Sequence, residues 1–247
     1  MATATENLTQ TFKFKQFEIQ QDKCAMKVGT DGVLLGAWTD VQNANSALDI
    51  GAGTGVIALM LAQRLLGNDS FSHAVEIDKD AYTQCVENFK ASPFATKTYC
   101  FLDSIQNFAK TVENRYDIIV SNPPFFSGGT FSSTENKTAV RHTVKLPHGD
   151  LLHATKSLLN PNGKFCVILP FIEGLRFIEV ATTYGFYLTK RTDVLPKAEK
   201  SVERLLLQFE NTPKSLIKDT IILQNSVPDR IYTDQYKELA KDFYTIF

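Results

Sequence analysis

An amide side chain, two prolines and an aromatic residue follow directly after an apolar run. They are Asn122, Pro123, Pro124 and Phe125. The prolines hold φ at about −65° and remove two N–H donors, which leaves a stiff row of backbone carbonyls beside the Asn122 amide. The Asn122 side-chain oxygen and the Pro123 carbonyl can accept the two hydrogens of an amino group, while Phe125 stacks on the planar group that carries it. The segment therefore predicts chemistry on an amino nitrogen attached to a π-system.

Such a nitrogen is a poor nucleophile, because its lone pair is delocalised into the π-system. Accepting both of its hydrogens favours the pyramidal nitrogen that forms during attack. Positioning and electrostatics, rather than a strong base, then supply most of the rate. From the residues alone the target remains open among N6 of adenine, N4 of cytosine, N2 of guanine and the side-chain amide of glutamine.

A glycine loop precedes this segment, between an apolar run and a helical stretch. It reads Asp49-Ile50-Gly51-Ala52-Gly53-Thr54-Gly55. Glycines allow a sharp turn and the close approach of a ligand. The spacing is G-x-G-x-G rather than G-x-G-x-x-G, and an acid beside the loop would repel the pyrophosphate of a dinucleotide. Asp49 instead suits a cationic amino-acid group, which disfavours a nicotinamide dehydrogenase.

Two further acids end the next apolar runs. Glu76 follows Ala74-Val75, and Asp103 follows Cys100–Leu102. A carboxylate at the tip of the second strand can accept both hydroxyls of a ribose, and one at the third tip can accept a hydrogen bond from an adenine amino group. Three acids at successive strand tips predict one binding site for a nucleoside with a cationic tail.

The elements that position these residues alternate between strand and helix patterns. We expect strands at 46–50, 71–77, 98–102, 117–120 and 164–169, and helices at 56–66, 81–90 and 151–158. Such alternation predicts an α/β fold with a doubly wound, mostly parallel sheet. Residues 186–194 and 202–210 read as a strand pair without a helix between them, which predicts an antiparallel C-terminal edge. Residues 12–19 favour a further small strand, and Asp80 is the expected N-cap of the helix at 81–90.

The loop and its acids resemble those of class I S-adenosylmethionine methyltransferases. The resemblance implies a Rossmann-like, seven-stranded sheet and S-adenosyl-L-methionine as cofactor. Asn122–Phe125 matches the [N/D]-P-P-[Y/F] motif of amino methyltransferases, and Phe125 stands where relatives often have tyrosine. Stacking survives that change, whereas a hydroxyl contact is lost.

The chain as a whole resembles the bacterial tRNA1(Val) adenine(37)-N6-methyltransferases. The resemblance includes Lys27–Gly32, the glycine loop, Ser121–Phe126, Arg191–Val194 and Phe243–Phe247. It implies methylation of N6 of the adenosine next to the anticodon, with the anticodon stem-loop of tRNA as partner, and it places Lys27 and Thr30 near the methionine end of the cofactor. The predicted cofactor site is Lys27, Thr30, Asp49, Gly51, Gly53, Gly55, Glu76, Ile77, Asp103 and Asn122.

Length and composition limit the number of domains and the class of protein. With 43% hydrophobic and 21% charged residues, the 247-residue chain is long enough for one compact domain and is not expected to be disordered. We expect two parts in the chain. The first is an N-terminal appendage at 1–40, whose helix at 33–38 is a lid over the cofactor site and is capped by Thr30 or Asp31; the second is a methyltransferase domain at 41–247.

The polar first ten residues predict a tail rather than a secretory signal. The four dispersed cysteines predict no metal site and a reducing cytoplasm; no membrane span is expected, and the protein is expected to be a monomer.

Net charge is −1, so nucleic acid must be held by local basic groups. Three groups are candidates: Lys13, Lys15, Lys23 and Lys27; Lys137, Arg141, His142 and Lys145; and Lys190, Arg191, Lys197, Lys200 and Arg204. Three alternatives remain open. The same tetrapeptide serves a protein glutamine methyltransferase or an rRNA guanine-N2 methyltransferase, and a non-catalytic cofactor-binding module would not need it.

Overall fold

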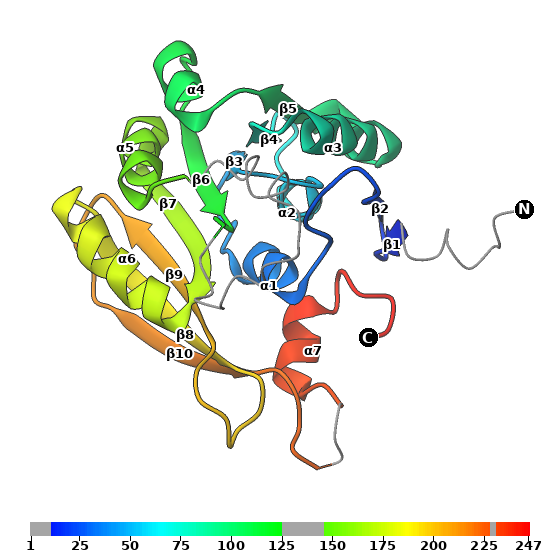
Figure 1. Ribbon diagram of the computed structural model, residues 1–247, viewed down its shortest axis with the longest axis vertical. Helices are drawn as coiled ribbons and strands as arrows, with labels where there is room; N and C mark the ends of the chain where they lie inside the picture. Colours follow the sequence, from blue (N-terminus) through cyan, green and yellow to red (C-terminus); the bar gives the residue numbers. More distant parts are fainter. Residues whose placement is uncertain (1–10, 125–145, 228–230) are drawn as a thin grey trace, which may run out of the picture.

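The main sheet has eight strands in the order β10-β8-β9-β7-β6-β3-β4-β5 (Figure 1). The computed structural model describes residues 11–124, 146–227 and 231–247. Within the main sheet every pairing is parallel except the two made by β9. The strands are β3 (Ser46–Ile50), β4 (Phe71–Glu76), β5 (Thr98–Leu102), β6 (Tyr116–Ser121), β7 (Leu159–Pro170), β8 (Tyr187–Leu195), β9 (Arg204–Glu210) and β10 (Ile217–Ile222).

Helices cover both faces of this sheet. Helices α1, α2, α3 and α7 share one hydrophobic cluster with the sheet, and α4, α5 and α6 share the other. Strand β6 shows why, since Ile118 and Val120 join the first cluster while Ile119 joins the second. The helices are α1 (Thr30–Trp38), α2 (Val56–Arg64), α3 (Lys79–Ala91), α4 (Ile105–Thr111), α5 (His148–Leu158), α6 (Phe171–Thr183) and α7 (Asp234–Ala240).

The direction of winding reverses between β3 and β6. The chain first adds β4 and β5 on one side of β3, then crosses back to place β6 on the other side. At such a switch point the loops that follow two neighbouring strands run in opposite directions and leave a crevice between them. A ligand binds in this crevice, outside the carboxyl ends of the strands. The glycine loop follows β3 and Asn122 follows β6, so both predicted segments stand at this point.

The hairpin that begins at Thr11 lies beside the C-terminal residues (Figure 1). Strands β1 (Thr11–Lys13) and β2 (Glu18–Gln20) form a small antiparallel hairpin. Phe14 forms a β-bridge with Tyr244, and the Lys15 N–H donates to the Phe243 carbonyl at 2.8 Å. The expected lid helix is α1, which packs on α2 and α7; the division of the chain at residue 40 stays a prediction.

The doubly wound, mostly parallel sheet is confirmed, but its predicted count of seven strands is too low. Strands β8 and β9 pair antiparallel as expected, yet the edge belongs to β10, which lies parallel to β8. The first four residues of β10 are exposed and include Lys218 and Asp219. A half-exposed edge strand needs no apolar run, so periodicity gives no sign of it.

Two predicted helix caps are wrong. Asp78, rather than Asp80, caps α3 and accepts hydrogen bonds from the N–H groups of Asp80 and Ala81. Gly29 occupies the N-cap position of α1, without a side-chain cap from Thr30 or Asp31. Among the described residues, no helix is long and apolar enough to traverse a bilayer.

Candidate functional site

A cavity of about 740 Å³ opens at the carboxyl edge of the sheet. Its walls come from the segment before α1, the glycine loop and the tips of β4, β5, β6 and β8. The cavity gathers most of the predicted site. The predicted residues that line it are Lys27, Thr30, Gly51, Gly53, Glu76, Ile77, Asp103, Asn122, Pro123 and Pro124. Phe125 lies outside the described residues.

The three glycines of the loop differ in what surrounds them. All have positive φ, at 74° for Gly51, 54° for Gly53 and 80° for Gly55. A Cβ on Gly51 or Gly53 would meet nothing within 4 Å, whereas one on Gly55 would lie 2.7 Å from both the Cys85 Sγ and the Phe89 ring. Gly51 and Gly53 therefore leave space beside the cavity. Gly55 does not line the cavity, and it permits α3 to pack closely on the loop.

Asp49 is also away from the cavity wall. Its side chain is fully buried, and Oδ2 accepts a hydrogen bond from the Ala58 N–H at 3.2 Å, in the first turn of α2. Gly55, the N-cap of α2, has no side chain to offer, so Asp49 serves that helix end. Oδ1 is buried without a hydrogen-bond partner in the part of the chain that the structure describes, and burial raises the pKa of the carboxyl to about 7.

This raised pKa predicts a pH-dependent stability. In the unfolded chain the carboxyl titrates near its ordinary value, about 3.9. Between the two pKa values the folded protein keeps a proton that the unfolded chain has released, so the free energy of unfolding falls as pH rises and levels off above about 7. Against Asp49→Asn, the wild-type protein is expected to lose on the order of 2 kcal/mol between pH 5 and pH 8. Urea unfolding of both proteins without ligand measures this, and parallel pH profiles would contradict the assignment.

Glu76 and Asp103 join the loop and the strand tips. The Glu76 carboxylate accepts hydrogen bonds from the N–H groups of Gly53 at 2.8 Å, Ile77 at 2.8 Å and Asp78 at 2.9 Å. The Asp103 N–H donates to the Glu76 carbonyl at 3.1 Å. The two acids therefore stand side by side along the cavity wall. The exposed Ile77 side chain adds an apolar surface beside them.

Asn122 is held at the end of β6 by its neighbour. Ser121 Oγ donates to the Ile50 carbonyl at 2.9 Å, which ties the tip of β6 to the start of the glycine loop. The Asn122 Oδ1 atom is buried and has no hydrogen-bond partner among the described residues. Pro123 is buried and Pro124 exposed. An acceptor without a donor, beside a cavity, is ready for an N–H group of a ligand.

Sequence reasoning missed one ion pair on the cavity wall. Arg204 Nε, at the start of β9, donates to Asp31 Oδ2 at 2.9 Å, and both residues line the cavity. The pair ties the start of α1 to the start of β9. No local pattern in the sequence joins two residues 173 positions apart.

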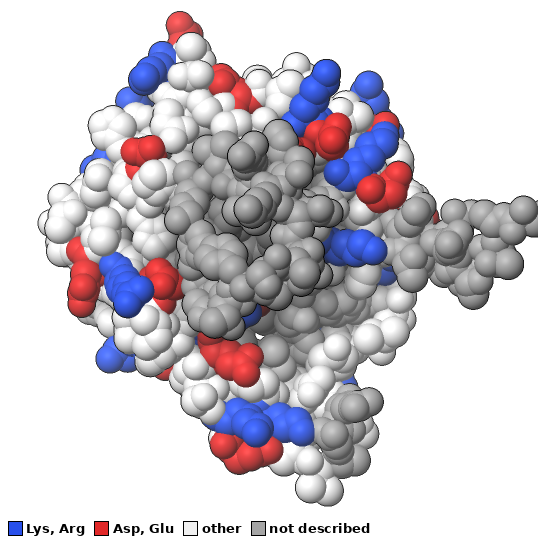
Figure 2. All heavy atoms as spheres, in the orientation of Figure 1, with Lys and Arg blue, Asp and Glu red and all other residues white. Residues whose placement is uncertain are grey.

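Most described members of the predicted basic groups already have partners. Lys and Arg side chains are interspersed with Asp and Glu on the face in Figure 2 rather than gathered into one patch. The pairs are Lys13–Glu18, Lys23–Glu87, Arg191–Asp193 and Arg204–Asp31, and Lys190 lies 4.6 Å from the Trp38 ring. Lys27 is exposed on the cavity wall. The group Lys137, Arg141, His142 and Lys145 lies outside the described residues.

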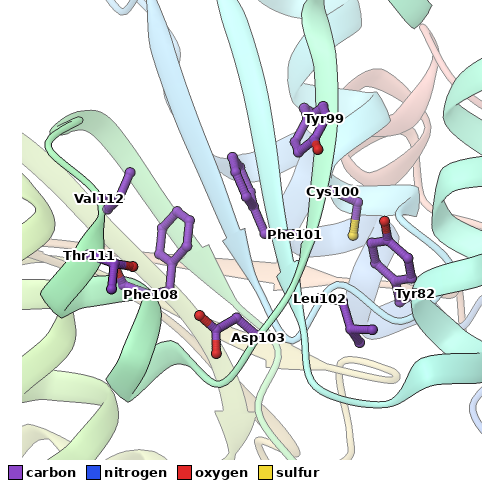
Figure 3. Close-up of a pocket in the computed structure, with 9 residues that line it drawn as sticks. All are labelled: Tyr82, Tyr99, Cys100, Phe101, Leu102, Asp103, Phe108, Thr111 and Val112. Atoms are coloured by element: carbon purple, nitrogen blue, oxygen red, sulfur yellow. The ribbon is translucent and has the colours of Figure 1, made fainter.

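A smaller cavity of about 300 Å³ lies at the edge strand β5 (Figure 3). Phe101 and Phe108 face each other there, with ring centroids 4.9 Å apart. Asp103 lines both cavities, but the glycine loop and Asn122 line the large one alone. The large cavity is therefore the candidate site.

Comparison with known proteins identifies the family. The family described as methyltransferase small domain matches residues 28–170. The chain is 43% identical to a tRNA1(Val) (adenine(37)-N6)-methyltransferase of Flavobacterium johnsoniae over 94% of this chain and 98% of that protein. A protein of the same name from Erwinia tasmaniensis is 42% identical over 94% of each chain. The chain belongs to the tRNA1(Val) (adenine(37)-N6)-methyltransferase family.

Solved structures place this methyltransferase in the class I fold. A predicted O-methyltransferase of Agrobacterium tumefaciens superposes with a TM-score of 0.66 at 14% identity, over 86% of this chain and 96% of that one. The glycopeptide N-methyltransferase MtfA, solved with S-adenosyl-L-methionine, gives a TM-score of 0.53 at 13% identity, over 75% of this chain and all of that one. These distant likenesses concern the fold alone.

Proposed function

We propose that the methyltransferase transfers a methyl group from S-adenosyl-L-methionine to N6 of adenosine-37 in tRNA1(Val). It would act as a monomer on the anticodon stem-loop, in the cytoplasm. The names of the relatives at 40–43% identity support the substrate. One structural observation carries the chemistry: the unpartnered Asn122 oxygen lies beside Pro123 at the cavity that also holds the glycine loop.

The residues present fit S-adenosyl-L-methionine. Gly51 and Gly53 leave open space where side chains would stand, and Glu76 and Asp103 present carboxylates for ribose hydroxyls and an adenine amino group. Lys27 and Thr30 also line the cavity, and we place the methionine end of the cofactor beside them. When bound, the cofactor supplies an electrophilic methyl group on a sulfonium. Asp49 and Gly55 support the loop from behind instead of touching the cofactor.

Asn122 and Pro123 would activate the target nitrogen. Each offers one oxygen acceptor, and together they take the two hydrogens of an exocyclic amino group. Because β6 and the Ser121–Ile50 hydrogen bond hold them in place, the acceptors are aligned before the target arrives. Adenosine-37 must leave the stacked anticodon loop to reach this cavity. Phe125, which we propose stacks on the extruded base, lies outside the described residues.

The decisive experiment identifies the methylated product. The protein is incubated with labelled S-adenosyl-L-methionine and total RNA from bacteria lacking the corresponding gene, and the digested RNA is separated into nucleosides. N6-methyladenosine in the tRNA fraction, mapped to position 37, is the expected result. Label in N2-methylguanosine of rRNA, or in protein from an added extract but not in RNA, would replace the proposal with one of the alternative substrates.

A further inference from the structure

Helix α3 carries two fully buried amide side chains that the proposed chemistry does not use. Gln84 and Asn88 are each 1% exposed and stand one helical turn apart. Both contact the stretch that starts at the last residue of β2, residues 20–28, which we call the N-terminal strap. Cys24–Val28 of the strap form one wall of the large cavity. The strap has no helix and, beyond Gln20, no strand to hold it.

Asn88 binds the strap and the glycine loop together. Its Oδ1 accepts a hydrogen bond from the Gln20 N–H at 2.9 Å, and its Nδ2 donates to the Gln20 carbonyl at 2.9 Å. Nδ2 also donates to the Thr54 carbonyl at 2.9 Å, within the loop. Both amide hydrogens therefore have acceptors, which fixes the orientation of the amide group. One buried side chain thus joins the start of the strap to the glycine loop, and both of these segments contribute residues to the cavity wall.

Two glutamines extend the attachment along the strap. Gln84 Oε1 accepts from the Lys23 N–H at 3.0 Å, and Gln21 Oε1 accepts from the Val28 N–H at 2.8 Å. Lys23 also pairs with Glu87 of α3. These side chains take the place of a strand partner for the strap backbone. These backbone groups are partly buried, so losing a partner carries a penalty, and the strap position depends on these amides.

We infer that Asn88 is a positioning residue that couples the N-terminal strap to the glycine loop, so that cofactor binding and docking of the strap favour each other. The inference rests on the proposed function for the identity of the cofactor. A cofactor that touches both the strap and the loop binds more tightly when the strap is docked. By linkage, the bound cofactor must hold the strap down by the same factor.

The test compares cofactor affinity and strap protection in three variants. Asn88→Leu removes all three hydrogen bonds at similar volume, and Asn88→Asp keeps the acceptor for Gln20 but loses both donations. Gln63→Leu is the matched control, because Gln63 Nε2 of α2 donates to the backbone carbonyl of Asp242, away from the cavity. Calorimetry with S-adenosylhomocysteine gives the dissociation constant. Hydrogen exchange of peptides covering residues 18–28, with and without this ligand, reports strap docking.

In the wild-type protein and in Gln63→Leu, the ligand is expected to slow exchange in the strap. In both Asn88 variants the dissociation constant should rise by about 10-fold, and most of the ligand-induced protection should vanish. The KM for S-adenosyl-L-methionine should rise as well, with kcat at saturation and the KM for RNA little changed. If Asn88 had only a structural role, its variants would have a lower melting temperature, but the KM for S-adenosyl-L-methionine would not rise separately from kcat and the KM for RNA.

Three results separate the possible failures. Wild-type protein that binds no S-adenosylhomocysteine would refute the proposed cofactor. If the wild-type protein binds the ligand, and Asn88→Asp binds it with the same affinity and shows the same strap protection, the coupling is overturned while the proposed cofactor stands. If Asn88→Leu does not fold, Gln84→Leu decides, because it releases Lys23 while leaving the Asn88–Thr54 bond intact. It should loosen the strap and weaken ligand binding less than Asn88→Asp, and an unaffected strap would count against the inference.

Discussion

Replacing Asn122 with alanine is expected to lower kcat by roughly 100- to 1000-fold, the effect of removing one aligned hydrogen-bonding group from a preorganised site. The alanine variant keeps the backbone carbonyl of Pro123 but loses the side-chain oxygen that would hold the second hydrogen of the target amino group. The Ser121–Ile50 hydrogen bond is untouched, so the cavity wall stays in place. Single-turnover rates at saturating cofactor and RNA measure the methyl-transfer step without contributions from binding.

Asn160→Ala is the matched control. Asn160 Nδ2 donates to Asp117 Oδ1 at 2.7 Å at the opposite end of β6, so this variant also removes an amide from the sheet. Its single-turnover rate should stay near that of the wild type. An Asn122→Ala protein with normal kcat and a large rise in the dissociation constant of S-adenosylhomocysteine would move Asn122 from the chemistry to cofactor binding.

Replacing Gly55 with alanine is expected to destabilise the folded protein by about 2–5 kcal/mol, from a left-handed backbone and an overpacked contact together. Its φ is 80°, and the new Cβ would lie 2.7 Å from the Cys85 Sγ and from the Phe89 ring. Both neighbours are buried side chains. Urea unfolding of Gly55→Ala measures the loss.

Gly53→Ala separates the two roles of the loop. At Gly53 the new Cβ meets no protein atom within 4 Å, so only the backbone cost of about 1–2 kcal/mol remains. Its methyl group stands beside the cavity, so this variant should instead weaken S-adenosylhomocysteine binding. Equal losses of stability in the two variants, or a cofactor defect confined to Gly55→Ala, would contradict this division of the loop.

The parts of the fold that follow from local pattern were predictable. Strand β5 begins and ends where its apolar run does, and β3 does likewise. Strand β7 begins before the expected start at residue 164: it takes in Pro161 and Gly163, and its register against β6 is broken there. A proline inside a strand is tolerated at such an irregularity. Only the pairing with β6 reveals it, and pairing is not a local property.

Some residues of the candidate site were also predictable from local pattern, and others were not. Glu76, Asp103 and Asn122 were predictable because each stands at the end of an apolar run and the ends of parallel strands share one edge. The positions of Asp49 and Gly55 behind the loop depend on how α2 and α3 pack, which no spacing in the loop encodes. Gln84 and Asn88 look like residues of a solvated helix face. They are buried because the strap covers that face, and the strap is distant in sequence.

The Phe14–Tyr244 bridge has a consequence for the order of folding. The bridge and the Lys15–Phe243 hydrogen bond join the hairpin of β1 and β2 to residues more than 200 positions further along the chain. Contacts of such high sequence separation form late, because a long loop must close before they are gained. The main sheet can therefore form before the hairpin makes its contacts with Phe243 and Tyr244.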